Sequence, residues 1–283
     1  MRLQGEQESG NVEDRRGIGG GGIAVGGGII GVIVLLFNLF TGGNVDPSQL
    51  PINTGQQTRQ LSPEEKAEQD KLASFSKKVL HTTETVWQKV LPEQANINYQ
   101  DPTLVLFTDA VQSACGNASS ATGPFYCPGD AKLYVDLSFF DELSNRFGAS
   151  GDFAMAYVIA HEVGHHIQNL LGTSEKMAQL RQQVSEGEYN KYSVKLELQA
   201  DYYAGVWAHY IQGQGLLEAG DIEEALTAAN AIGDDRLQKQ ARGYVVPESF
   251  THGTSAQRMY WLKKGYQSGD LRQGDTFNDP SLK

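Results

Sequence analysis

The sequence predicts a helix-rich α+β domain with a small β-sheet, preceded by one transmembrane helix. Three observations lead to this prediction. A glycine-rich, apolar run near the N-terminus has no ionisable residue over 24 positions. Most of the following chain has helical periodicity with recognisable cap residues, whereas only two short segments are apolar in the manner of buried strands. Hydrophobic residues make up 40% of the 283 residues, enough for one sizeable core.

The charge balance argues against a nucleic-acid partner. The chain has 23 Lys and Arg against 34 Asp and Glu, for a net charge of -11. Proteins that bind DNA or RNA need clustered cations to neutralise phosphates. The 32 glycines follow no triplet period, which also excludes a collagen-like chain.

The apolar run covers residues 17–40 and reads GIGGGGIAVGGGIIGVIVLLFNLF. A membrane-spanning helix needs about 20 such residues. A flexible glycine-rich linker would not explain the apolar residues 29–40, and no small-residue cleavage site follows Phe40, as a cleaved signal peptide requires. We therefore expect a single membrane anchor. Two GxxxG spacings would allow such helices to associate; they are Gly22/Gly26 and Gly27/Gly31.

Basic residues near this run predict its orientation. Three arginines precede the run, and only Arg59 follows it within about 20 residues. The three are Arg2, Arg15 and Arg16. The positive-inside rule therefore keeps residues 1–16 in the cytoplasm as a tail and exports the chain beyond the inner (cytoplasmic) membrane. Residues 41–62 are polar and rich in Gly, Pro, Gln and Asn, as expected of a linker.

Two cysteines agree with export. Cys115 and Cys127 lie twelve positions apart in a loop rich in Gly, Ser and Pro. Such a spacing suits a disulfide formed in an oxidising compartment, whereas a metal-binding pair would be closer and would have more partners. Two free, buried thiols are the alternative.

The exported part reads mainly as helices. Ser62, Pro63 and two glutamates make a good helix start, and we expect that helix to run to about residue 87. Two expected strands, 103–107 and 132–137, flank the cysteine loop. Further helices are expected at 151–171, 194–212, 222–231, 235–242 and 254–266. The expected domain is 63–268, followed by a flexible tail at 269–283.

The chemistry is expected in the helix DFAMAYVIAHEVGHHIQNLL, which contains HExxH. At 3.6 residues per turn, His161 and His165 share one face and can bind one metal ion. Glu162 lies beside them, where it can take a proton from a bound water. Two surface histidines on an ordinary helix are the alternative, but the preceding turns are apolar. His166 points about 140° away from the ligand face and is expected to pack or form hydrogen bonds.

Two histidines do not complete a zinc site, and no third histidine follows in the extended motif. The run ELQADYYAG instead offers Glu197 and Asp201, which share a helix face at i, i+4. A solvated acidic face is the alternative, but the neighbouring residues are unusually apolar. We expect Glu197 to bind the metal and Asp201 to accept the N–H of a ligating histidine.

HExxH followed by ExxxD resembles the gluzincin metallopeptidases. The longer run from CGNASSATGPFYCPGD through AHEVGHHIQNLLG to ELQADYYAG resembles the bacterial neutral zinc metallopeptidase family. The resemblance covers most of the chain. It implies a zincin fold, one catalytic Zn2+, the ligands His161, His165 and Glu197, and Glu162 as the general base.

An oxyanion formed on the substrate needs a second donor. The segment SFTHGTSAQRMYWL offers His252 and Arg258, and similar His-then-Arg segments follow the zinc site in gluzincins. We expect His252 to be that catalytic donor; Tyr202 and Tyr203 are weaker candidates. In zincins, a strand placed like 132–137 is the sheet edge on which an extended peptide docks.

The sequence thus predicts a membrane-anchored zinc metalloendopeptidase acting on a peptide or protein substrate. One alternative is a non-catalytic, zinc-stabilised binding or chaperone module of the cell envelope, although such a module would not need Glu162. Another is a zinc hydrolase of a non-peptide amide, for example in cell-wall material.

Overall fold

A computed structural model describes residues 1–17 and 62–282. Within these two ranges, no helix is both long and apolar enough to cross a bilayer. The expected anchor at residues 17–40, with its two GxxxG spacings, and the expected linker at 41–62 fall almost entirely outside the described residues. The prediction of a helix-rich α+β domain with a small sheet is confirmed.

The first long helix, α2, covers Pro63–Ala95 and begins as expected. Ser62 accepts a hydrogen bond from the backbone N–H of Glu65, and the Glu65 side chain accepts one from the N–H of Ser62 in return. This capping box satisfies amide groups that the first helical turn leaves unpaired. The helix continues eight residues beyond the expected end and contains Pro92 in its last turns.

The main sheet has four strands in the order β1–β2–β6–β5. The strands are β1 (Val12–Asp14), β2 (Thr103–Phe107), β6 (Lys132–Asp136) and β5 (Phe125–Cys127). β1 and β6 run parallel to β2, and β5 runs antiparallel to β6. The two strands predicted from the sequence are therefore the central ones. The expectation that residues 132–137 form a sheet edge is wrong, because β5 covers that side of β6.

A small hairpin accompanies the sheet. It pairs β3 (Ala110–Ser113) with β4 (Gly116–Ser119). The disulfide joins Cys115 in the hairpin turn to Cys127 in β5, with the two Cα atoms 5.8 Å apart. This separation lies within the range that a disulfide allows, so the predicted pairing is confirmed. The bond ties the edge strand of the main sheet to the hairpin.

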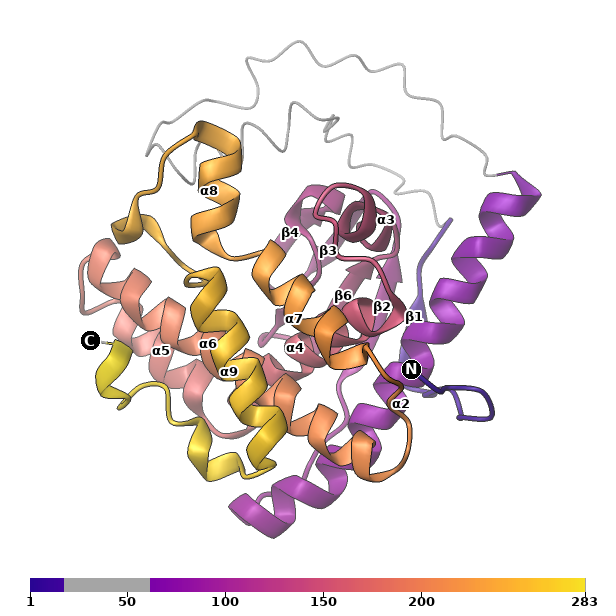
Figure 1. The fold of residues 1–283 in the computed structure, drawn as a ribbon, viewed down its shortest axis with the longest axis horizontal. Helices are drawn as coiled ribbons and strands as arrows, with labels where there is room; N and C mark the ends of the chain where they lie inside the picture. The colour runs from indigo at the N-terminus through magenta and orange to yellow at the C-terminus, as the bar shows by residue number, and fades with distance from the viewer. Residues whose placement is uncertain (18–61, 283) are drawn as a thin grey trace.

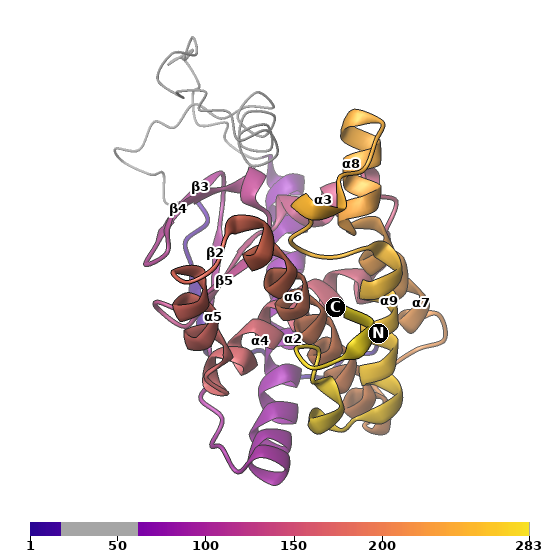
Figure 2. The same ribbon diagram turned by 90° about the vertical axis from the view of Figure 1, so that its left-hand side faces the viewer.

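Helices make up most of the remaining domain and lie to one side of the sheet (Figures 1 and 2). They are α3 (Ser138–Asn145), α4 (Asp152–Leu170), α5 (Thr173–Arg181), α6 (Glu186–Gly213), α7 (Asp221–Ala231), α8 (Asp234–Arg242) and α9 (Ser255–Ser268). α6 begins eight residues before its expected start because Ser185 caps it, accepting a hydrogen bond from the N–H of Glu188. α3 and α5 were not predicted from the sequence.

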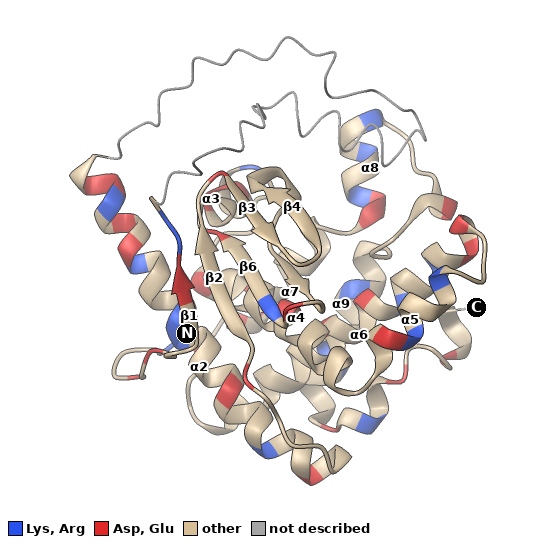
Figure 3. Cartoon of the chain, turned by 180° about the vertical axis from the view of Figure 1, so that it is seen from behind, with Lys and Arg blue, Asp and Glu red and all other residues tan. Residues whose placement is uncertain are grey.

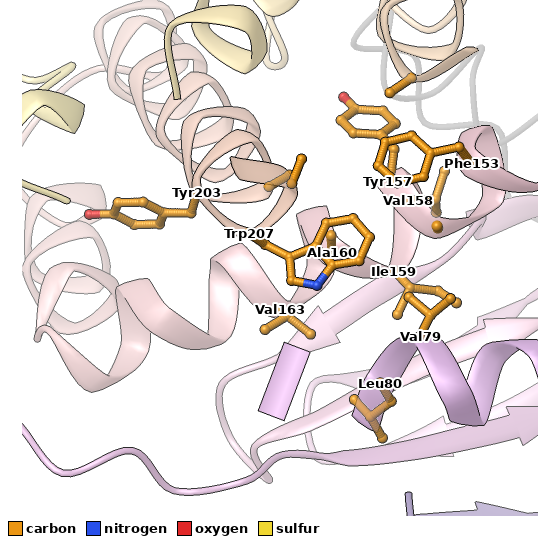
Figure 4. Close-up of a cluster of buried hydrophobic side chains, with 14 of the residues drawn as sticks. Val79, Leu80, Phe153, Tyr157, Val158, Ile159, Ala160, Val163, Tyr203 and Trp207 are labelled. Atoms are coloured by element: carbon orange, nitrogen blue, oxygen red, sulfur yellow. The ribbon is translucent and has the colours of Figure 1, made fainter. Parts of the chain in front are cut away.

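The core forms where α2, α4 and α6 meet (Figure 4). Phe153 of α4 stacks on Trp207 of α6 with ring centroids 5.6 Å apart. Val79 and Leu80 of α2 are fully buried beside them. α4 is therefore held between two other helices, which explains why its residues before HExxH are nearly all apolar.

Both ends of the described chain pack on this domain, which differs from the prediction of a separate tail at each end. Met1 and Leu3 are each 7% exposed and belong to the main core cluster, and β1 is a strand of the main sheet. In the expected C-terminal tail, Leu271 is buried and Thr276 is fully buried. Short 3-10 turns occur there at Leu271–Gly274 and Pro280–Leu282.

Candidate metal centre

Two helices that cross closely carry the candidate metal ligands. His161 and His165 lie on α4, and Glu197 lies on α6. The helices approach closely at Gly164, where an added Cβ would lie 2.8 Å from the carbonyl oxygen of Ala200. Any side chain at position 164 would therefore push the helices apart. The glycine of HEVGH allows the third ligand to reach the two histidines.

The three side chains converge on one point. One donor atom from each of His161, His165 and Glu197 lies within 4.8 Å of the others. Glu197 Oε2 is 3.1 Å from His161 Nε2 and 3.5 Å from His165 Nε2. Donors that share a tetrahedral zinc ion at about 2.0–2.2 Å are separated by similar distances. The structure thus brings together the three residues that the sequence analysis proposed as ligands.

Asp201 occupies the other side of the His161 ring. Its Oδ1 lies 2.8 Å from His161 Nδ1, and it also accepts hydrogen bonds from the Tyr157 hydroxyl at 2.5 Å and from Arg258 Nη2 at 2.9 Å. Arg258 Nε donates to Oδ2 at 2.8 Å. All four side chains are almost completely buried. Asp201 therefore orients the His161 ring and does not face the point of convergence, as the sequence analysis expected.

Gln168 contacts the His165 ring in the same way that Asp201 contacts the His161 ring. Its Oε1 lies 2.8 Å from His165 Nδ1, and its Nε2 donates to the carbonyl oxygen of Leu196 at 2.7 Å. Gln168 is fully buried. Each histidine thus has an acceptor at Nδ1, which fixes the N–H there and leaves Nε2 as the ligand atom.

The charges of this cluster reinforce one another. Burial opposes ionisation of Asp201, but Arg258 and His161 outweigh it and lower the pKa of that carboxyl to about 2. Burial likewise opposes a charged His165, yet Glu197 outweighs it and raises the pKa of the imidazole to about 9. Against the opposing effect of burial, His165 and His252 hold the pKa of Glu197 well below its ordinary value. The cluster therefore stabilises a buried positive charge at the point of convergence.

Glu162 has a different environment from the other acids of the site. It is 7% exposed, and no described residue donates a hydrogen bond to its carboxylate or forms an ion pair with it. It follows His161 directly on α4, so it lies beside the ligand pair. An unpaired carboxylate next to a metal centre is available to accept a proton.

His166 is not among the three converging side chains and forms hydrogen bonds elsewhere. Its Nδ1 lies 3.0 Å from the hydroxyl of Tyr126 in β5, and its Nε2 donates to the carbonyl oxygen of Gln100 at 2.6 Å. Tyr126 also accepts a hydrogen bond from Asn169. These contacts attach the edge strand β5 to the helix that carries HExxH.

His252 lies in the loop before α9, after a 3-10 turn at Pro247–Ser249. Asp234 holds this loop, because its Oδ2 accepts the backbone N–H groups of Thr251, His252 and Gly253 at 2.6–3.0 Å. The His252 side chain is half-exposed. Burial opposes its charge, but Glu197 and Asp234 raise its pKa above the ordinary value.

The other candidate donors are engaged elsewhere. Arg258 is 2% exposed and pairs with Asp201. The Tyr202 hydroxyl donates to the carbonyl oxygen of Asp270 at 2.6 Å, and Tyr203 packs edge-on against Trp87. His252 is therefore the one of these four candidates whose side chain is accessible.

The positioning roles of Tyr157 and Gln168 were not predicted from the sequence. Tyr157 lies four residues before His161, and Gln168 lies three residues after His165. Both spacings place a side chain on the same helix face as the ligand, which is the signal that could have identified them. Their partners on α6 become apparent only when the helices are packed.

Comparisons with known proteins agree with this geometry. The family model described as "putative neutral zinc metallopeptidase" matches residues 1–277. The uncharacterized protein YpfJ of Escherichia coli K12 is 50% identical over 288 residues, covering 98% of this chain and 99% of the relative. The uncharacterized protein Rv2575 of Mycobacterium tuberculosis is 45% identical over 213 residues, covering 71% of this chain and 69% of the relative. No solved structure matches the chain.

Proposed function

The chain belongs to the neutral zinc metallopeptidase family, and from this premise we propose that it hydrolyses peptide bonds in protein substrates at a zinc centre formed by His161, His165 and Glu197. The observation that carries the proposal is the convergence of these three side chains on one point, with Glu162 unpaired beside it. The name of the family supplies the reaction class, and the geometry supplies the residues.

The residues fit a zinc ion on chemical grounds. Both ring nitrogens of His161 face carboxylate oxygens, at 2.8 Å and 3.1 Å. A neutral imidazole has only one N–H, so one nitrogen would face a carboxylate with its lone pair. A second proton or a metal ion removes that repulsion. Two imidazoles and one carboxylate are also the protein ligands typical of hydrolytic zinc sites.

When bound, zinc supplies a Lewis acid that lowers the pKa of a water molecule and polarises a carbonyl group. Glu162, beside the ligand pair, would accept a proton from the attacking water and deliver it to the leaving amine. Asp201 and Gln168 hold the two imidazoles in the orientation that this reaction requires. Arg258 acts through Asp201, because its guanidinium neutralises the charge of a fully buried carboxylate.

We assign His252 as the donor to the developing oxyanion. Asp234 fixes the backbone of the loop that carries His252, and the charge of Glu197 acts on the half-exposed imidazole. In the metal-free chain, Glu197 and Asp234 raise the pKa of this imidazole above its ordinary value, and a protonated ring is a hydrogen-bond donor. This role would explain why a buried aspartate fixes the loop that carries a half-exposed histidine.

A peptide substrate is proposed to pair with the free edge of β5. β5 is the edge strand next to β6, and Tyr126 and His166 attach it to α4. An extended peptide added to such an edge gains main-chain hydrogen bonds and is aligned with the strand. The disulfide at Cys127 fixes the end of this edge.

The site is proposed to act outside the cytoplasm, in association with the inner membrane. The disulfide supports an oxidising compartment, where such bonds form and persist. The apolar run at residues 17–40 supports an association with lipid, because a loop exposed to water rarely contains so long an apolar segment. Proteins of the cell envelope are therefore the expected substrates.

The function is tested with a Glu162→Gln variant and a matched control, Glu188→Gln, which changes an exposed glutamate on α6. Zinc-loaded wild type and control should cleave an unfolded protein such as casein, whereas Glu162→Gln should lose at least a hundredfold in kcat/KM. Equal cleavage by Glu162→Gln and wild type would refute the mechanism. Cleavage of cell-wall amides in place of casein would favour the non-peptide hydrolase, and no turnover of either would favour the binding module.

A further inference from the structure

We infer that residues 1–17 lie on the same side of the membrane as the metallopeptidase domain. This inference replaces the cytoplasmic N-terminal tail expected from the sequence. It rests on the packing of the N-terminal segment and is independent of whether the domain hydrolyses peptides.

The N-terminal segment is part of the main sheet. β1 pairs with β2 in register Val12↔Leu104 and Asp14↔Leu106. The backbone N–H of Leu104 donates to Asn11 at 2.9 Å, and that of Arg15 donates to Leu106 at 2.8 Å. β1 therefore forms one edge of the sheet, next to β2 (Figure 3). Without it, β2 would present a row of unpaired backbone groups.

Buried polar contacts connect the same segment to α2. The Ser9 hydroxyl donates to Glu84 Oε1 at 2.6 Å, and Asn11 Nδ2 donates to the same oxygen at 2.9 Å. Ser9 and Glu84 are both buried. Withdrawing the N-terminal segment would remove two donors from a buried carboxylate, and unpaired buried acceptors are costly.

The beginning of the chain reaches the helix that carries HExxH. The Met1 amino group lies 2.7 Å from Asp152 of α4 and 3.3 Å from Asp221 of α7. Leu3 is buried in the core cluster. The segment thus contacts the domain at both of its ends, and the family model includes it from residue 1 onward.

The arginines that predicted a cytoplasmic N-terminus have partners in the folded chain. Arg2 pairs with Glu218 of the segment before α7 at 3.4 Å. Arg16 pairs with Asp70 of α2 at 3.1 Å. Arg15 pairs with Glu13 within β1, and Glu13 also pairs with Lys132 of β6. These arginines therefore form ion pairs within the folded chain, so they are weaker evidence for a cytoplasmic N-terminus by the positive-inside rule.

The side of the membrane follows from this packing. Residues 12–14 form a strand of the main sheet, and residue 62 caps α2 of the same folded domain. The N-terminal segment and the domain therefore lie on the same side of any membrane with which the chain associates.

Two variants of the full chain, each with one added cysteine, test this inference. Gln7→Cys probes the N-terminal segment, and Gln240→Cys is the matched control in the domain. Gln7 and Gln240 are both exposed, so neither substitution should disturb the fold. Each variant is expressed in bacteria, and intact spheroplasts are treated with a membrane-impermeant maleimide. Wild type, whose own cysteines are joined in a disulfide, gives the background.

Both positions should be labelled to the same extent, with no increase on permeabilisation. Labelling of Gln240→Cys with protection of Gln7→Cys would restore the cytoplasmic N-terminal tail and overturn the inference. As a second measurement, Gln7→Cys labelling in urea-treated detergent extracts shows that the thiol is reactive, so protection in spheroplasts cannot come from a blocked side chain.

Discussion

Replacing Asp201 by Asn should separate two roles of one buried carboxylate. Asp201 is fully buried and accepts hydrogen bonds from Tyr157, His161 and Arg258. Asparagine keeps the shape but carries no charge, so the Arg258 guanidinium would be buried without a counter-ion. Breaking a buried ion pair in this way costs roughly 3–5 kcal/mol of the free energy of unfolding.

The same change should weaken zinc binding by another route. The Asp201 carboxylate accepts the Nδ1 proton of His161 and increases the basicity of the ligand nitrogen. Loss of such a partner lowers metal affinity about 10–100-fold, or roughly 1.4–2.7 kcal/mol. Some zinc should therefore still bind to the variant at saturating concentration.

The double variant Asp201→Asn/Arg258→Met distinguishes these effects. Removing the stranded guanidinium should restore more than half of the lost free energy of unfolding, measured by urea denaturation of the metal-free chain. Zinc affinity, measured by competition with a chromophoric chelator, should stay low, because the carboxylate is still missing. If Asp201→Asn binds zinc as tightly as wild type, or if the double variant is no more stable than the single one, the role assigned to Asp201 is wrong.

Other predictions follow from neighbouring features. Gly164→Ala should lower zinc affinity at least tenfold with little loss of helix content by circular dichroism, because its Cβ would meet Ala200 at 2.8 Å and separate α4 from α6; unchanged affinity would mean that the helices adjust without moving Glu197. Cys115→Ser should raise KM for casein more than it lowers kcat, since the bond fixes the edge of β5. His252→Ala should lower kcat without releasing zinc, and equal kcat would exclude it as an oxyanion donor. The metal-free chain should lose stability as pH falls from about 4 to about 2, because the lowered pKa of Asp201 stabilises the fold above its ordinary pKa and this contribution is lost below; a denaturation midpoint that does not change over this range would contradict it.

The metal site was largely predictable because its spacing is local. His161 and His165 share a face on any helix, and the same holds for Glu197 and Asp201. The order of the two acids, with the longer side chain first, predicted which one lies at the Nε2 atoms. The sequence alone did not indicate that Arg258 would neutralise Asp201, because the two residues are 57 positions apart and lie on different helices.

The N-terminal strand was not predictable for the same physical reason. Val12–Asp14 has three residues, two of them acidic, and shows no alternation that would indicate a strand. Its stability comes from pairing with Leu104 and its neighbours, more than 90 positions away. β5 is equally short, so the sequence analysis took β6 for the sheet edge. Short strands depend on their partners more than on their own residues.

Zinc content of the purified full chain tests the central claim most directly. Metal analysis after dialysis should give one zinc per chain for wild type and for Glu162→Gln, because the substitution removes no ligand. Glu197→Ala should give almost none, because it removes one of the three converging donors. A wild type without zinc, a Glu162→Gln variant that loses it, or a Glu197→Ala variant that keeps a full equivalent would contradict the account.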